Sequence, residues 1–139
     1  MSDVTYASVK VGDVVPALTK DEITRTTLGL FAGASGDHNP IHIDIDFARA
    51  AGMEDVFAHG MLSMAYLAQI LINWVPQTAL RSYAVRFTAI TNLKDRISCS
   101  GEITEKFEEN GETLVRVAVQ AVNQYGDVKL AGDAVVALP

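Results

Sequence analysis

Residues 59–75, HGMLSMAYLAQILINWV, decide the fold, because they form the longest apolar segment in a chain of 139 residues. Apolar side chains lie around most of the circumference when the segment is drawn as a helix. This pattern predicts a helix from His59 to Val75 that is buried on several sides. The segment is shorter than the roughly 20 residues of a membrane span, and Ser63, Tyr66 and Gln69 interrupt it. We therefore expect a core helix and no membrane partner.

The pattern changes after residue 78, where alternation with a period of two begins. Tyr83, Val85 and Phe87 alternate with small or polar neighbours, as in half-buried antiparallel strands. Asn110-Gly111 is a strong signal for a hairpin turn. We predict an antiparallel meander wrapped around the helix, in a single α+β domain over residues 1–139. Its strands are expected at 80–91, 96–106, 112–123 and 127–138. A fifth strand is expected near 14–18.

The residues before the core helix favour helices and an ordered loop. Thr19-Lys20-Asp21-Glu22 matches a capping box, so we expect the first helix to begin there and to end at Gly36. Asn39 precedes Pro40, which disfavours a helix through residues 37–43. Asp44 is positioned to cap a second helix over 45–51, which Gly52 would end.

Composition excludes several classes of protein. The net charge is −6, from 17 acidic and 11 basic side chains, and this argues against a nucleic-acid or membrane-surface partner. Cys99 is the only cysteine, so neither a disulfide framework nor a cysteine zinc site is expected. Its place on a predicted strand favours packing. The N-terminus lacks the features of a secretory signal, and we expect a cytoplasmic protein.

A loop rich in polar side chains is the strongest candidate for chemistry. Residues 31–44 have the sequence FAGASGDHNPIHID, and all three histidines lie between positions 38 and 59. A short loop stiffened by Pro40 can direct the Asp37 carboxylate and the His42 imidazole at one point, as general acid–base catalysis requires. His38 and His42 have the spacing of helical metal ligands, but Pro40 between them disrupts that geometry. We therefore expect no metal site.

This segment closely resembles the signature of the MaoC-like dehydratases, the family of (R)-specific enoyl-CoA hydratases and (3R)-hydroxyacyl dehydratases. The signature runs aromatic, small residues, Ser-Gly-Asp-x-Asn-Pro-hydrophobic-His-x-Asp, and the chain fills every position from Phe31 to Asp44. The resemblance continues through 57–63 (FAHGMLS) and 85–87 (VRF). It implies a hot-dog fold and reversible syn hydration of a trans-2-enoyl thioester of coenzyme A or acyl carrier protein, without a cofactor.

The resemblance also implies roles for individual residues. Asp37 and His42 would be the catalytic pair that holds and activates water, with Asn39 and Pro40 supporting the loop. Which of the pair is the base stays open, because coupled groups titrate together. The Gly60 N–H, at the start of the apolar helix, would stabilise the developing negative charge on the thioester oxygen. The alternative for Gly60 is that it only permits close packing.

Other polar residues leave two interpretations each. His59 either orients the loop or caps the helix, and the Ser63 hydroxyl either lines the thioester pocket or bonds to its own helix. His38 occupies a variable position of the signature. Four basic side chains form either a patch for carrier phosphates or solvated strand charges: Arg81, Arg86, Lys94 and Arg96. Ile90-Thr91 and Lys94-Asp95 replace the Pro-Val and Gly-Asp that are common in the family.

The sequence is also compatible with two other functions. The chain could be a hot-dog thioesterase, which would release free thiol, or a noncatalytic partner subunit of another hot-dog protein. A sheet of four or five strands also leaves an edge strand exposed. Such edges are commonly covered by pairing with the same edge of a second copy across a twofold axis. We therefore expect a homodimer.

Overall fold

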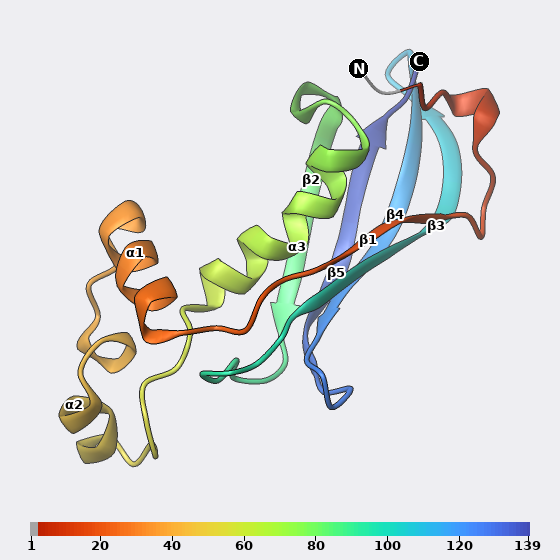
Figure 1. Cartoon of the computed structure of the whole chain (residues 1–139). Helices are drawn as coiled ribbons and strands as arrows, with labels where there is room; N and C mark the ends of the chain where they lie inside the picture. The colour runs from red at the N-terminus through yellow and green to blue at the C-terminus, as the bar shows by residue number, and fades with distance from the viewer. Residues whose placement is uncertain (1–2) are drawn as a thin grey trace.

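The computed structural model describes residues 3–139, and its centre is one five-stranded antiparallel sheet (Figure 1). The strand order is β1-β3-β4-β5-β2. The strands are β1 (Val14–Thr19), β2 (Leu80–Phe87), β3 (Ser98–Glu109), β4 (Glu112–Val122) and β5 (Val128–Ala137). The helices are α1 (Arg25–Ser35), α2 (Ile45–Ala50) and α3 (Gly60–Trp74), with 3-10 turns η1 (Tyr6–Ser8), η2 (Pro40–His42) and η3 (Gln77–Ala79).

The core lies between α3 and one face of the sheet, and α3 contacts all five strands. Leu67, Ile70 and Leu71 of α3 are at most 1% exposed, and they share one hydrophobic cluster with Val115 and Val117 of β4. The predicted α+β architecture, a sheet around a long apolar helix, is therefore confirmed. Within residues 3–139, no helix combines the length and the apolar character that crossing a lipid bilayer requires.

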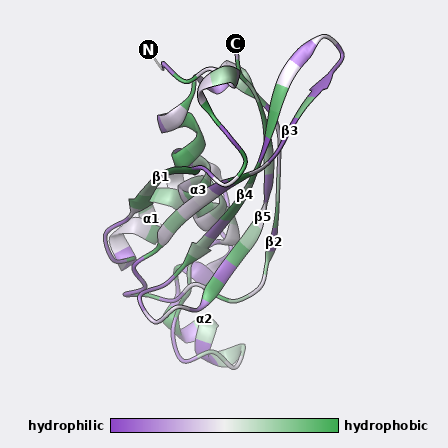
Figure 2. Ribbon diagram, turned by 90° about the vertical axis from the view of Figure 1, so that its right-hand side faces the viewer, coloured by the Kyte–Doolittle hydropathy of each residue, from purple (hydrophilic) through white to green (hydrophobic). Residues whose placement is uncertain are grey.

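Strands β3, β4 and β5 form the predicted meander, and Figure 2 shows the β3–β4 hairpin projecting at one end of the molecule. Asn110 and Gly111 both have positive φ, 52° and 78°, as the predicted tight turn requires. The meander does not extend to β2, which pairs with β5 instead of β3. The predicted strand near residue 14 is confirmed as β1, which pairs with β3. Among the described residues, β1 and β2 are thus the two edge strands.

The predicted start of the first helix at Thr19 is wrong. Thr19 ends β1, and the backbone N–H groups of Lys20 and Ile23 donate to carbonyls of residues 97 and 95, which keeps the chain extended beyond the strand. The helix begins only where these bonds stop, with Thr24 as its N-cap in a capping box with Thr27. Strand pairing has therefore overridden the local capping pattern.

Helices α1 and α2 lie to one side of the sheet, beyond the N-terminal end of α3 (Figure 1). Gly36 ends α1 in the left-handed conformation, with φ of 77°, as predicted. Asp44 caps α2, because its carboxylate accepts the N–H groups of Asp46 and Phe47. Residues 37–43, between α1 and α2, are called the signature loop below. His59, which directly precedes α3, bonds to the backbone of Asp37 and so holds this loop at the start of the core helix.

Candidate active site

The signature loop is fixed by a series of short side-chain to backbone hydrogen bonds. The Ser35 hydroxyl accepts the N–H of Asp37 at 3.1 Å, and the Asp37 carboxylate accepts the N–H of Asn39 at 3.2 Å. The Asn39 side chain in turn accepts the N–H of Ile41 at 3.1 Å and caps η2, in which Pro40 is the first residue. Asn39 and Pro40 therefore lie where a rigid loop needs them, and Asp37 remains exposed to solvent.

His42 lies at the end of this turn and is 8% exposed. Its Nδ1–H donates to the carbonyl of Phe57 at 2.7 Å, since a carbonyl oxygen only accepts. The neutral ring then carries its free lone pair on Nε2. The Phe57 ring stands edge-on to the imidazole, with 5.1 Å between centroids. His42 is thus held in one orientation and one tautomer, as a proton-transfer group must be.

His59 connects the loop to α3. Its side chain is 1% exposed, its Nε2–H donates to the backbone carbonyl of Asp37 at 3.1 Å, and its ring stacks on His42 at 4.0 Å. Phe31 packs edge-on against the His59 ring, with centroids 4.9 Å apart. His59 makes no side-chain cap bond to α3. Of the two predicted roles, the contacts favour orientation of the loop.

Burial of His59 makes its ring harder to protonate. Desolvation, and after it the neighbouring His42, lowers the pKa of His59 from its ordinary value of 6.5. The Nδ1 atom of His59 is buried without a hydrogen-bond partner among the described residues. Because Nε2 already carries the proton, a neutral ring leaves Nδ1 as an unused acceptor. An unsatisfied acceptor in the interior is costly and is typical of functional sites.

Asp37, His42 and His59 each have one possible metal-ligand atom, a carboxylate oxygen or a ring nitrogen, and these three atoms lie within 4.8 Å of one another. Three such groups are chemically able to hold a metal ion. A shared ion, however, needs imidazole lone pairs that converge in the ring planes, and these two rings are stacked with only 29° between planes. The arrangement favours proton transfer around one small molecule. His38, which has the sequence spacing of a metal ligand relative to His42, is exposed and does not belong to this group.

Gly60 is the first residue of α3, so its N–H has no acceptor within the helix. A Cβ at this position would lie 3.2 Å from the Phe87 ring, so close packing also favours glycine here. The Ser63 hydroxyl does not bond to its own helix. It donates to the Thr91 hydroxyl at 3.2 Å, and both side chains are buried.

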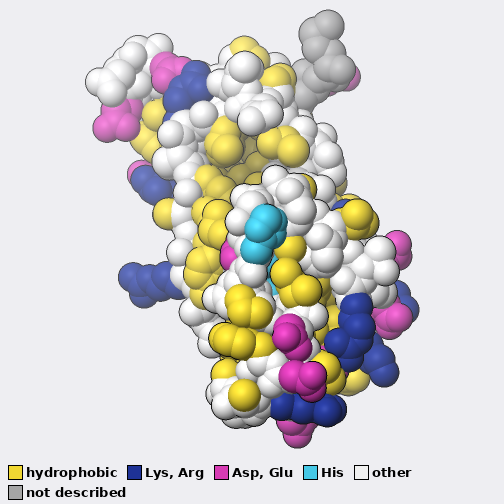
Figure 3. All heavy atoms as spheres, turned by 90° about the vertical axis from the view of Figure 1, so that its left-hand side faces the viewer, with side chains coloured by type: hydrophobic (Ala, Val, Ile, Leu, Met, Phe, Trp, Pro, Cys, Tyr) yellow, Lys and Arg dark blue, Asp and Glu magenta, His cyan; other side chains and the backbone are white. Residues whose placement is uncertain are grey.

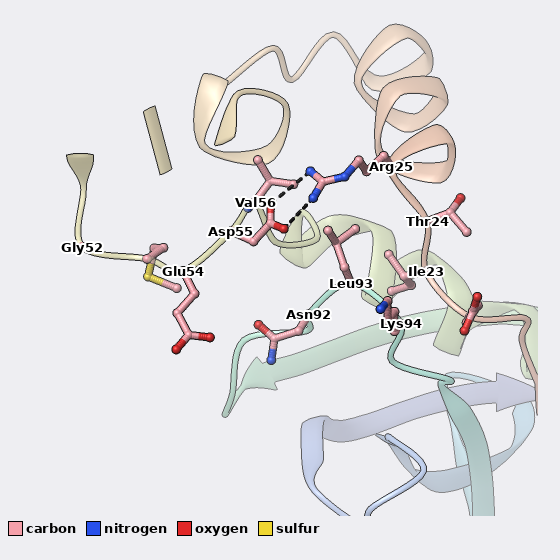
Figure 4. Close-up of a pocket in the computed structure, with 12 residues that line it drawn as sticks. Ile23, Thr24, Arg25, Gly52, Glu54, Asp55, Val56, Asn92, Leu93 and Lys94 are labelled. Atoms are coloured by element: carbon pink, nitrogen blue, oxygen red, sulfur yellow. Dashed lines mark hydrogen bonds and ion pairs between the residues drawn. The ribbon is translucent and has the colours of Figure 1, made fainter. Parts of the chain in front are cut away.

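Figure 3 shows the face formed by the α1–α2 side of the molecule, where histidine atoms reach the surface among apolar side chains. A cavity of about 720 Å³ opens between residues 22–25, 52–56 and 92–94. Figure 4 shows Arg25 and Asp55 facing each other across it, and their paired hydrogen bonds measure 3.0 and 2.5 Å. Val56 lines this cavity and precedes Phe57, whose carbonyl holds His42. No residue of the signature loop lines the cavity, and its link to the loop runs through residues 56 and 57.

Two of the four basic side chains considered for a carrier patch have separate acidic partners. Arg81 pairs with Glu112 beside the β3–β4 hairpin, whereas Arg96 lies near Glu22 before the start of β3. Cys99 is fully buried, and burial raises the pKa of its thiol to about 11, which suits packing and not nucleophilic chemistry.

Several contacts of the site were not predicted. The Phe57 carbonyl is a backbone group, for which no side-chain pattern exists. In the sequence, Thr91 stands out only as a departure from the family pattern. The ring contact of Phe31 with His59 has a signal in the aromatic position of the signature, which would have placed Phe31 in the site.

Comparison with known proteins matches residues 8–124 to the family described as MaoC like domain. The (R)-specific enoyl-CoA hydratase of Rhodospirillum rubrum is 27% identical over 119 residues, covering 84% of this chain and 81% of that protein. Fatty acid synthase subunit beta of Saccharomyces cerevisiae is 30% identical over 138 residues, but the chain spans only 6% of its length. R-hydratase PhaJ1 from Pseudomonas aeruginosa superposes with a TM-score of 0.84 at 32% identity, covering 97% and 85% of the two chains.

Proposed function

The chain belongs to the MaoC-like domain family and has its hot-dog fold, and from this premise we propose that it is an (R)-specific hydratase or dehydratase of acyl thioesters. The observation that carries the proposal is the convergence of Asp37, His42 and His59 within 4.8 Å, with His42 held by Phe57 so that Nε2 is free. The relatives are named hydratases and dehydratases, and this supports a hydro-lyase.

In the proposed reaction, one water lies between the Asp37 carboxylate and Nε2 of His42. One group removes a proton from the water as its oxygen bonds to carbon 3 of a trans-2-enoyl thioester, and the pair returns a proton to carbon 2. The electrons of the double bond pass to the thioester oxygen during this step. The N–H of Gly60, at the positive end of α3, would stabilise that oxygen. Loss of water from a (3R)-hydroxyacyl thioester is the reverse.

The other site residues act through this pair. Asn39 and Pro40 set the course of the loop, and His59 holds the Asp37 backbone while it stacks on His42. The Ser63 hydroxyl lies one turn beyond Gly60 on α3 and lines a small cavity beside it. We assign the pantetheine arm of the carrier to the larger cavity crossed by Arg25 and Asp55, because its volume suits an extended ligand and its lining ends at Val56, next to the Phe57 carbonyl that holds His42.

We also propose a homodimer in the cytoplasm. β1 and β2 each have one neighbour in the sheet within residues 3–139, and an uncovered edge invites pairing with a second copy. Each protomer would carry its own Asp37 and His42. The single, buried Cys99 suits a reducing compartment. Light scattering that gives twice the chain mass supports the dimer, and a fully active monomer excludes it.

The test of function is the product formed from crotonyl-CoA by the purified chain. We expect the ultraviolet absorbance of the enoyl thioester to fall without release of free thiol, and chiral analysis to find mainly (3R)-hydroxybutyryl-CoA. Release of thiol would identify a thioesterase instead. A folded chain that leaves the thioester unchanged would identify a noncatalytic partner subunit, and mainly (3S) product would contradict the stereochemical assignment.

A further inference from the structure

Lys129 is a buried lysine of β5, and a bulge in the strand places it in the interior. Ala121 and Val122 are consecutive on β4, but their partners on β5 are residues 130 and 128. Lys129 is therefore one extra residue on β5 between these two pairs. Lys129 and Leu130 are both buried, at 5% and 0% exposed, although consecutive residues of a regular strand face opposite sides. Bulges that redirect a side chain in this way are common next to active sites.

The Lys129 ammonium holds the segment that follows β2. It donates to the carbonyl of Ile90 at 2.7 Å and lies 3.4 Å from the carboxylate of Asp95. The carboxylate oxygen that faces Lys129 also accepts the N–H of Asn92 at 2.9 Å. The side-chain amide of Asn123 donates to the other carboxylate oxygen at 3.4 Å. One buried pair of charged side chains thus fixes two backbone groups of the segment, the carbonyl of residue 90 and the N–H of residue 92.

This segment in turn supports the chain that leads into α3. The Ala58 N–H donates to the carbonyl of Thr91 at 2.9 Å, and Phe57 forms an antiparallel bridge with Asn92. The carbonyl of Phe57 is the group that accepts the Nδ1–H of His42 at 2.7 Å. A continuous series of bonds therefore runs from β5, through the segment after β2, to the imidazole of His42.

A gain in stability alone does not account for a buried ion pair at this place. Apolar side chains of similar volume are often as stabilising, because the loss of hydration offsets the attraction between the charges. What the pair adds is direction, since charge-assisted hydrogen bonds hold their partners more firmly than neutral ones. Lys129 and Phe57 also line the same small cavity of about 140 Å³ beside Gly60, so the pair lies close to the candidate site as well as being bonded to it.

We propose that Lys129 and Asp95 are positioning residues of the candidate active site, and that they hold the Phe57 carbonyl where it keeps His42 in one tautomer with Nε2 free. Both side chains act through backbone groups, so neither is a catalytic residue. The inference rests on the proposed function, and it adds two residues that set its rate from outside the signature loop. A displacement of about 1 Å at a reacting group is enough to lower a rate about 10²-fold.

The test measures kcat and KM for hydration of crotonyl-CoA in Lys129→Met/Asp95→Asn, which leaves no charge buried but loses the donor to the Ile90 carbonyl. We expect kcat to fall about 10- to 100-fold, while KM stays close to that of the wild type. Lys129→Arg is the conservative variant. It keeps the charge and the donors, and the adjoining cavity has room for the larger head group, so it should retain most of the wild-type kcat.

Ile103→Ala is the matched control for lost stability. Ile103 is 1% exposed, pairs with Val117 of β4 and forms none of the bonds that hold residues 90–92. Its truncation destabilises the core without loosening that segment, so kcat should stay near the wild-type value. If Lys129→Met/Asp95→Asn does not fold, Lys129→Gln/Asp95→Asn takes its place. Its two amides can bond to each other, but the glutamine side chain is one bond shorter than lysine and does not reach the Ile90 carbonyl.

Nuclear magnetic resonance of the isotope-labelled His42 ring provides a readout that does not need turnover. We expect a proton on Nδ1 alone in the wild type and a mixture of both tautomers in the double variant. That mixture, in a protein whose wild type hydrates no enoyl thioester, would support the positioning role while refuting the proposed function. Hydration with an unchanged kcat or an unchanged His42 tautomer in the folded double variant would overturn the inference and leave the function intact. An equal loss of kcat in Ile103→Ala, or a change confined to KM, would overturn it as well.

Discussion

Replacement of Lys129 by methionine should destabilise the protein strongly. The ammonium of Lys129 and the carboxylate of Asp95 are 3.4 Å apart, and their side chains are only 5% and 7% exposed. Asp95 also accepts the N–H of Asn92 at 2.9 Å, while Lys129 donates to the carbonyl of Ile90 at 2.7 Å. The pair therefore holds the segment between β2 and β3, including the rim of the small cavity.

The size of the effect follows from the burial of the charge that remains. Removing one partner of a buried ion pair leaves the other uncompensated, which costs about 3 to 5 kcal/mol in the free energy of unfolding. The thermal midpoint should fall by on the order of 10 °C. In the double variant Lys129→Met/Asp95→Asn no charge is left buried, and the amide oxygen introduced by the second substitution can still accept the N–H of Asn92. The double variant should therefore lose less than the sum of the two single losses.

Urea denaturation of the wild type, both single variants and the double variant measures this coupling directly. Arg81→Met is the matched control, because the Arg81–Glu112 pair is 39% and 40% exposed and screened by solvent. Its loss should be much smaller. A Lys129→Met protein as stable as Arg81→Met, or a double variant that loses the full sum of the single losses, would refute the reasoning.

Three further predictions concern the candidate active site. Asp37→Asn and His42→Ala should each lower kcat about 10²- to 10⁴-fold with a native circular dichroism spectrum, and a folded variant with wild-type turnover would contradict the assignment. Burial lowers the pKa of His59, so below pH 6.5, the ordinary pKa of histidine, the unfolded chain binds more protons than the folded protein. The free energy of unfolding should therefore fall as the pH drops below 6.5. Urea titrations should find a slope of up to about 1.4 kcal/mol per pH unit that is absent in His59→Asn, and an identical slope in both proteins would count against a buried neutral His59. In Gly60→Ala the new Cβ would lie 3.2 Å from the Phe87 ring but the N–H is kept, so KM for the thioester should rise more than kcat falls. A second change, Phe87→Leu, should restore KM, and no recovery in the double variant would argue against this steric cause.

Much of the architecture could be predicted because its signals are local. The apolar run after Gly60, the alternation around Val85 and the turn at Asn110 each depend on residues that are near one another in the chain. The failure at Thr19 has the opposite cause. Its four-residue capping pattern is present, but pairing of β1 with β3, far away in the sequence, keeps that segment extended.

The same distinction applies to the candidate site. Asp37 and His42 could be placed together because one short loop carries both. The stack of His59 on His42 joins two segments, and a single sequence contains no pattern for such a contact. The bond from Lys129 to the Ile90 carbonyl was missed for the same reason, because it links β5 to the segment after β2.

The position of β1 at the edge of the sheet has a consequence for folding kinetics. Val15 pairs with Gly101, so this contact closes a very long loop of chain, and such closures slow folding. During synthesis the signature loop leaves the ribosome well before β3, and the strand that anchors the start of α1 has no partner until β3 appears. In refolding experiments, packing of the half-buried Trp74 of α3 against the core should therefore precede the recovery of the proposed hydratase activity.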